Sequence, residues 1–114
     1  MALDKTALDS IREIDPDGIL GLIKDVIKVF IDSMPTELTE LETHHMANLP
    51  LEMAQTAHRF KSSCQTVGAT DMTLLLREIE TKKNELTFDQ RENILVQIKA
   101  LAKTVESELH ELIS

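Results

Sequence analysis

The chain has 114 residues and a formal charge of −8, and 42% of its residues are apolar. This length fits one domain, residues 1–114, with room for one hydrophobic core. The composition is typical of helical proteins: it has few aromatic residues, glycines and prolines and is rich in Leu, Ile, Glu, Lys and Ala. The negative charge, unrelieved by any run of Lys or Arg, argues against nucleic acid as a partner.

The single cysteine and the most hydrophobic segment of the chain indicate its cellular location. Cys64 alone can form neither an intramolecular disulfide nor a Cys-based zinc cluster, which favours a reducing compartment. The most hydrophobic segment, 18–31, is interrupted by Lys24, Asp25 and Lys28. We therefore expect no signal peptide, no membrane association and a cytoplasmic location.

The first half of the chain predicts three helices separated by short turns. A short helix is expected over 4–14, ended by the sequence DPDG, in which Asp15 caps and Pro16 opens a second helix. The second helix runs to about Ser33, and Pro35 starts a third that the sequence ANLP ends. One apolar stripe marks the second helix: Ile19, Leu22, Ile23, Val26, Ile27, Phe30 and Ile31.

A fourth and a fifth helix follow. Pro50 suits the first turn of a helix that reaches Val67, where Gly68 fits the left-handed residue at which many helices end. Thr70 is the expected cap of a fifth helix, which runs to about Asn84.

The last helix begins after a capping box, in which Thr87 caps and Gln90 follows three residues later. No segment alternates in the manner of a half-buried strand. We therefore predict an all-α fold, an antiparallel up-down four-helix bundle with an additional short N-terminal helix at one end.

The position of His58 on its helix carries the functional argument. The apolar stripe of that helix consists of Met53, Ala57, Phe60, Cys64 and Val67. At about 100° per residue, His58 lies roughly 140° from the centre of this stripe and should face water. Lys61, Ser62 and Gln65 lie on the same outer side, and the small Ala54, Ser62 and Ala69 are expected to leave the imidazole uncovered.

An exposed histidine beside a lysine suits the transfer of a phosphoryl group, although many histidines are core or surface residues without a role. A neutral imidazole, with an ordinary pKa of about 6.5, is a nucleophile at neutral pH. Lys61, one turn from His58, can neutralise a phosphoryl group attached there. This spacing favours a transient phosphoryl carrier.

The stretch AHRFKSSCQTVGATDMTLLLREIE resembles the histidine-containing phosphotransfer (HPt) domain of phosphorelays. The likeness extends upstream through LDKTALDSIREID and SMPTELTELE, and so covers nearly the whole chain. The family fold is a four-helix bundle with a shorter helix. The matching positions of the main stretch are Ala57, His58, Lys61, Ser63, Gly68, Ala69 and Glu80.

The resemblance implies that His58 accepts a phosphoryl group from the aspartate of one receiver domain and passes it to another. It implies that Lys61 steadies the phosphate, with Ser62, Gln65 and Gly68 in supporting positions. Ser62 stands where the family usually has glycine, which lets a partner's backbone approach the histidine. Gln65 suits a hydrogen bond to the phosphoryl group or to a partner, and equally a solvated surface.

The resemblance also implies the partners, which are receiver domains of response regulators or hybrid sensor kinases. We expect Mg²⁺ in the receiver, no cofactor in this chain, and a monomer. An apolar docking patch around the histidine is expected in part from the first two helices. Its candidate residues, each at least as well suited to the core, are Leu8, Ile11, Ile14, Leu20 and Ile23.

The sequence gives less support to other functions. His44 and His45 diverge by about 100° on a helix and lack further ligands at zinc spacing, so two solvated histidines are expected. The chain carries no Gly-rich phosphate loop and no sensor-kinase histidine box, so we expect a phosphotransfer domain without autonomous kinase activity. The alternative is a non-transferring helical module that binds response regulators. Ser62 favours that alternative, whereas the intact His58 and Lys61 argue against it. The start at Met1 favours a freestanding protein, and an excised domain is left open.

Overall fold

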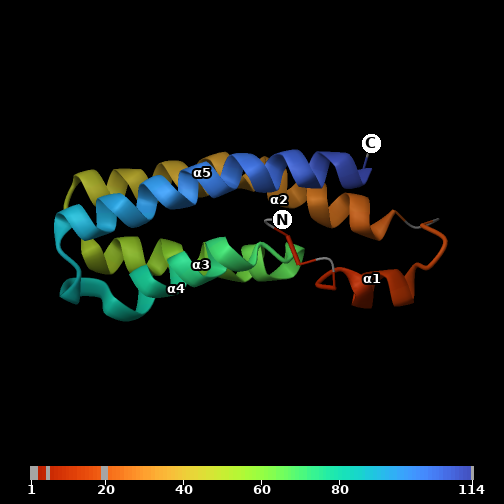
Figure 1. Ribbon diagram of the computed structural model, residues 1–114, viewed down its shortest axis with the longest axis horizontal. Helices are drawn as coiled ribbons and strands as arrows, with labels where there is room; N and C mark the ends of the chain where they lie inside the picture. Colours follow the sequence, from red (N-terminus) through yellow and green to blue (C-terminus); the bar gives the residue numbers. More distant parts are fainter. Residues whose placement is uncertain (1–2, 5, 19–20, 114) are drawn as a thin grey trace.

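The computed structural model describes residues 3–4, 6–18 and 21–113, and in these ranges it contains helices and no strand (Figure 1). The all-α prediction is therefore confirmed. The elements in chain order are α1 (Asp9–Ile14), α2 (Leu22–Met46), α3 (Pro50–Val67), α4 (Thr70–Lys82), the 3₁₀ turn η1 (Lys83–Glu85) and α5 (Phe88–Ile113). None of the helices in the described ranges has the length and apolar content needed to cross a membrane.

The four longer helices form an antiparallel bundle, and the whole molecule, with α1 at one end, measures 48 × 22 × 21 Å (Figure 1). α3 packs against α2 and α4, and α5 packs against the same two helices (Figure 1). α1 lies beyond the end of α3 and contacts α2. The predicted bundle with an additional short N-terminal helix is therefore correct.

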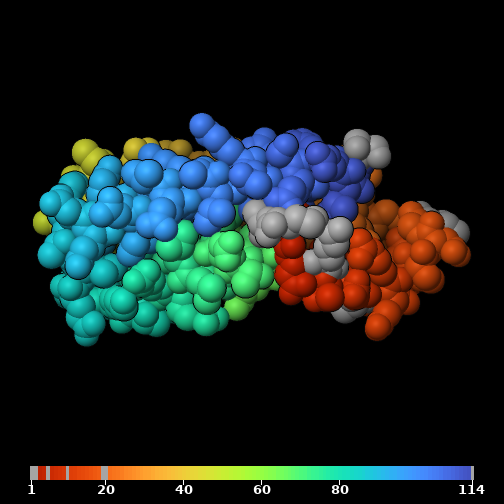
Figure 2. All heavy atoms as spheres, in the orientation of Figure 1, coloured from red at the N-terminus to blue at the C-terminus, as the bar shows by residue number. Residues whose placement is uncertain are grey.

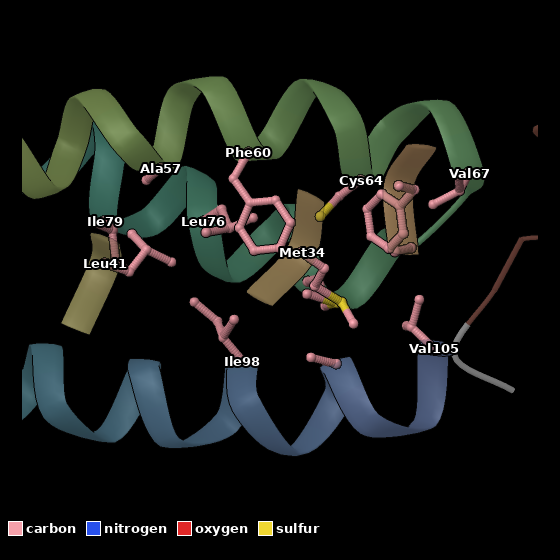
Figure 3. Packing of buried hydrophobic residues seen from close by; sticks show 14 of the residues in the cluster. Met34, Leu41, Ala57, Phe60, Cys64, Val67, Leu76, Ile79, Ile98 and Val105 are labelled. Atoms are coloured by element: carbon pink, nitrogen blue, oxygen red, sulfur yellow. The ribbon is translucent and has the colours of Figure 1, made fainter. Parts of the chain in front are cut away.

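The core fills the space between α3 and the other helices of the bundle. The five residues of the stripe predicted on α3 are all buried. Phe60 and Cys64 point from α3 toward α5, where Ile98 and Val105 face them (Figure 3). Burial raises the pKa of the Cys64 thiol to about 12, so this side chain is a protonated core residue at neutral pH.

α2 corrects the prediction of two helices separated near Pro35. It is one helix of 25 residues with Pro35 inside it. An interior proline costs a helix about 3 kcal/mol, because it removes a backbone hydrogen bond and crowds the preceding turn. Here Phe30 and Met34 before the proline and Leu41 after it share one buried face. Packing of that face on α3 and α5 offsets the cost and keeps the helix continuous.

The starts of α1 and α2 are later than predicted. Asp4 accepts hydrogen bonds from the backbone N–H of Thr6 (3.0 Å) and from its hydroxyl (2.7 Å), which forms a turn where helix was expected. α2 begins at Leu22 and not at Pro16, because Gly21 has a left-handed φ of 67° immediately before it. Of the stripe predicted for this helix, Ile19 lies outside the described residues.

The predicted capping box is confirmed, and a second predicted cap is wrong. The backbone N–H of Gln90 donates to Thr87 Oγ1 (3.1 Å), and Gln90 Oε1 accepts from the backbone N–H of Thr87 (2.8 Å). Thr70 is the first residue of α4, and its hydroxyl donates to the Gly68 carbonyl. It therefore does not cap the helix.

Candidate functional site

Gly68 ends α3 and fixes the path of the N-terminal segment. It adopts a left-handed φ of 79°, and the following N–H of Ala69 closes the helix on the Cys64 carbonyl. The backbone N–H of Asp4 donates to the Gly68 carbonyl at 2.7 Å. A Cβ at position 68 would overlap the Asp4 carbonyl and lie 2.8 Å from Cβ of Ala7. The N-terminal segment consequently packs against the end of α3, as Figure 2 shows in red beside green.

His58 lies on the outer side of α3, as the helical wheel predicts. Its side chain is 69% exposed. Its Nδ1 is hydrogen-bonded to Oε2 of Glu80, which comes from α4. An ionised carboxylate can only accept, so Nδ1 carries the proton and Nε2 keeps its lone pair. Glu80 therefore orients the imidazole and leaves Nε2 without a proton.

Lys61 is paired with the same carboxylate. Its Nζ donates to Oε1 of Glu80 at 2.9 Å, and the two side chains are only 14% and 19% exposed. The Lys61 hydrogen bond, joined by that of His58, holds the pKa of Glu80 below its ordinary value. Glu80 is therefore ionised at neutral pH and links the histidine to the lysine.

Sequence reasoning did not assign Glu80 to the site, although the residue matches the family pattern. It lies 22 residues from His58 and 19 from Lys61, so no helical spacing joins them. The position of Glu80 depends on how α4 packs along α3.

The other side of α3 is tied to α2 by Arg59. Its Nε donates to both carboxylate oxygens of Glu37, at 3.1 and 3.2 Å, and its Nη2 donates to Glu40. The hydrogen bond from Arg59 also lowers the pKa of Glu40. His58 therefore projects from a helix that is held by ion pairs to the neighbouring helices on both sides.

Two of the small residues expected beside His58 are not on the surface. Ala54 and Ala69 are buried, so their expected place on the outer side of the helix is wrong, although the imidazole itself is exposed as expected. Ala54 faces the α4 side of α3 with Glu80, and Ala69 lies in the tight turn after Gly68. Ser62 is exposed, and its hydroxyl donates to the His58 carbonyl at 3.4 Å.

Gln65 lies further along the same surface. It is exposed and lines a shallow hollow between α3 and α4 together with Gly68 and Arg77. The structure thus gathers His58, Lys61 and Glu80 by direct contact, with Gln65 about two turns away from the histidine.

The apolar patch expected from the first two helices is mostly part of the core. Leu8 is buried, and Ile11 and Ile23 are partly buried against the core cluster. Ile14 is 70% exposed, whereas Leu20 lies outside the described residues. These side chains therefore do not form one continuous exposed surface.

His45 corrects the prediction of two solvated histidines. It is buried, its ring stacks on that of Phe88 with centroids 4.1 Å apart, and its Nε2 contacts Glu92. Among the described residues, no three His, Cys, Asp or Glu side chains are grouped so as to hold a metal ion. His45 therefore joins α2 to α5.

The fold and this site define a class of protein: an antiparallel helical bundle that carries an exposed histidine oriented by a carboxylate of the neighbouring helix. The model of the Hpt domain family matches residues 25–113, from the first turns of α2 to the end of α5. The chain therefore belongs to the Hpt domain family, whose members act in histidine phosphotransfer of two-component signalling and interact with receiver domains. Comparisons with curated proteins and with solved structures give no match.

Proposed function

We propose that this protein is a phosphoryl carrier of a two-component phosphorelay and that His58 is its acceptor. The observation that supports this most directly is the contact between His58 Nδ1 and Glu80 on a side chain that is 69% exposed. This contact fixes the tautomer, while the exposure leaves Nε2 accessible to a docked receiver.

The transfer is a displacement at phosphorus. The lone pair of Nε2 attacks the phosphorus of an aspartyl phosphate, a P–N bond forms, and the P–O bond to the aspartate breaks. The aspartate leaves as a carboxylate with the bonding pair. The imidazole becomes cationic and retains its proton on Nδ1, where the carboxylate of Glu80 stabilises the new charge. Mg²⁺ bound by the receiver would neutralise the phosphoryl oxygens, and the reverse reaction delivers the group to a second receiver.

Lys61 acts in this proposal by holding Glu80. Its ammonium donates to Glu80 and is largely shielded by α4, so the phosphoryl group is not its principal partner. Removing Lys61 should therefore misplace the carboxylate and slow transfer.

Incubation with a panel of phosphorylated receiver domains and Mg²⁺ tests the acceptor. The protein should take up label that is lost in acid, because phosphohistidine is acid-labile, and His58→Gln should take up none while keeping its helicity. Label that survives acid, or that remains on His58→Gln, would refute the assignment. Binding of receivers without any label would favour the non-transferring module.

A further inference from the structure

A hollow of about 440 Å³ lies beside His58 along the seam between α3 and the end of α4. It is on the N-terminal side of His58 along α3, whereas Lys61 lies on the C-terminal side. The hollow is lined by Leu51, Ala54, Gln55, His58, Glu80 and Lys83. Because Nδ1 of His58 is taken by Glu80, a phosphoryl group would be attached at Nε2, and the carboxylate of Glu80, which also lines the hollow, is already paired with Lys61.

Two polar side chains that line this hollow have no partner among the described residues. In the described part of the chain, the ammonium of Lys83 and the amide of Gln55 make no hydrogen bond or ion pair, and both residues are exposed. The neighbouring Lys82, in contrast, donates to Glu78 at 2.9 Å. The two adjacent lysines therefore differ in what they face.

The backbone explains this difference. Lys83 has a φ of 40° and a ψ of −112°, so the chain leaves the helical path of α4 at this residue. A residue other than glycine in such a conformation is uncommon and costs on the order of 1 kcal/mol or more. The turn that requires it brings Lys83 to the hollow beside His58.

We propose that Lys83, assisted by Gln55, binds the phosphoryl group once it is attached to Nε2 of His58. The inference rests on the proposed function. The phosphoryl group is a dianion, Lys83 supplies an ammonium with three donors, and Gln55 supplies an amide donor one turn before the histidine. Lys61, which the sequence favours for this task, is already committed to Glu80.

Phosphoramidate, a donor that needs no receiver, gives a direct test. It transfers its phosphoryl group to Nε2 and releases ammonia, and the product is followed by ³¹P NMR as a function of pH. A nearby cation favours the dianion, so Lys83→Met should raise the midpoint of the phosphoryl titration by about 0.5 pH unit. Lys83→Arg should restore most of the difference.

Lys82→Met is the matched control, because it removes the same charge from the adjacent residue. It should leave the midpoint within about 0.1 pH unit of wild type, since Lys82 faces Glu78. Equal midpoints for Lys83→Met and Lys82→Met would overturn the inference while leaving His58 as acceptor. A wild type that phosphoramidate fails to label, or label that persists in His58→Gln, would overturn the proposed function and this inference together.

Discussion

The shared carboxylate of Glu80 predicts the effect of a change that alters its charge but hardly its shape. Oε2 of Glu80 accepts from His58, and Oε1 accepts from Lys61. In Glu80→Gln only one of these atoms remains an acceptor, so either the imidazole or the ammonium loses its partner. Both donors also lose the negative charge that strengthens their hydrogen bonds.

The magnitude follows from the kind of hydrogen bond that is lost. Bonds to charged groups contribute about 1.5–3 kcal/mol and neutral ones about 0.5–1.5 kcal/mol. His58 is mostly exposed, so screening by solvent reduces the loss below the range for charged groups. A loss of about 1 kcal/mol in the transition state corresponds to roughly fivefold slower transfer.

Rapid-quench measurement of transfer from one phosphorylated receiver compares wild type, Glu80→Gln and Glu78→Gln. Glu78 is the control because it lies on the same helix and pairs with Lys82 away from the histidine. We expect Glu78→Gln to transfer within twofold of wild type. Equal rates for all three proteins, or equal slowing in both variants, would refute the role given to the Glu80 carboxylate.

Three further predictions concern the stability of the fold. Gly68→Ala should lower the free energy of unfolding in urea by about 2 kcal/mol or more, because the added methyl group meets the Asp4 backbone. Gly18 has a similarly left-handed φ but open space around it, so Gly18→Ala should cost only about 1 kcal/mol. Equal costs for the two variants would contradict the close approach of the N-terminal segment to Gly68. Thr87→Ala should cost about 1 kcal/mol through loss of its cap to Gln90, and an unchanged urea midpoint would exclude that contribution. The pKa of Glu80 is lowered from 4.5, so the ionised carboxylate stabilises the fold above that pH, and this stabilisation is lost as pH falls below it. The difference in unfolding free energy between wild type and Glu80→Gln should therefore narrow between pH 5 and pH 3. A constant difference would contradict the pairing of an ionised Glu80 with Lys61 and His58.

Local sequence signals were sufficient to predict α3 and the exposure of its histidine. Pro50 and Gly68 mark the ends of this helix, and the apolar stripe between them determines which side is buried. Once that side is known, the 3.6-residue period places His58 in water. The capping box before α5 was equally predictable, because both of its partners lie within one turn.

The remaining features depend on contacts between distant segments. Pro35 is a local signal for a helix break, yet burial of Met34 and Leu41 on the same face of α2 overrides it. Likewise, a helical wheel places Lys61 on the outer side of α3 but carries no information on α4, which supplies its partner Glu80. Pairing across helices requires the packing of the helices first.

The distribution of charge along the chain bears on how an acidic protein could approach a phosphorylated, and therefore anionic, receiver. A net charge of −8 would by itself repel a receiver that carries an aspartyl phosphate. However, residues 50–85, which form α3, α4 and η1, contain five Lys or Arg and five Asp or Glu, so the whole excess of negative charge lies elsewhere in the chain. Within this neutral segment Glu80 is paired with Lys61, and Lys83 faces the hollow beside His58 with no carboxylate partner in the described residues. The proposed acceptor, His58, therefore lies in a segment that adds no net negative charge of its own to repel an approaching phosphoryl group.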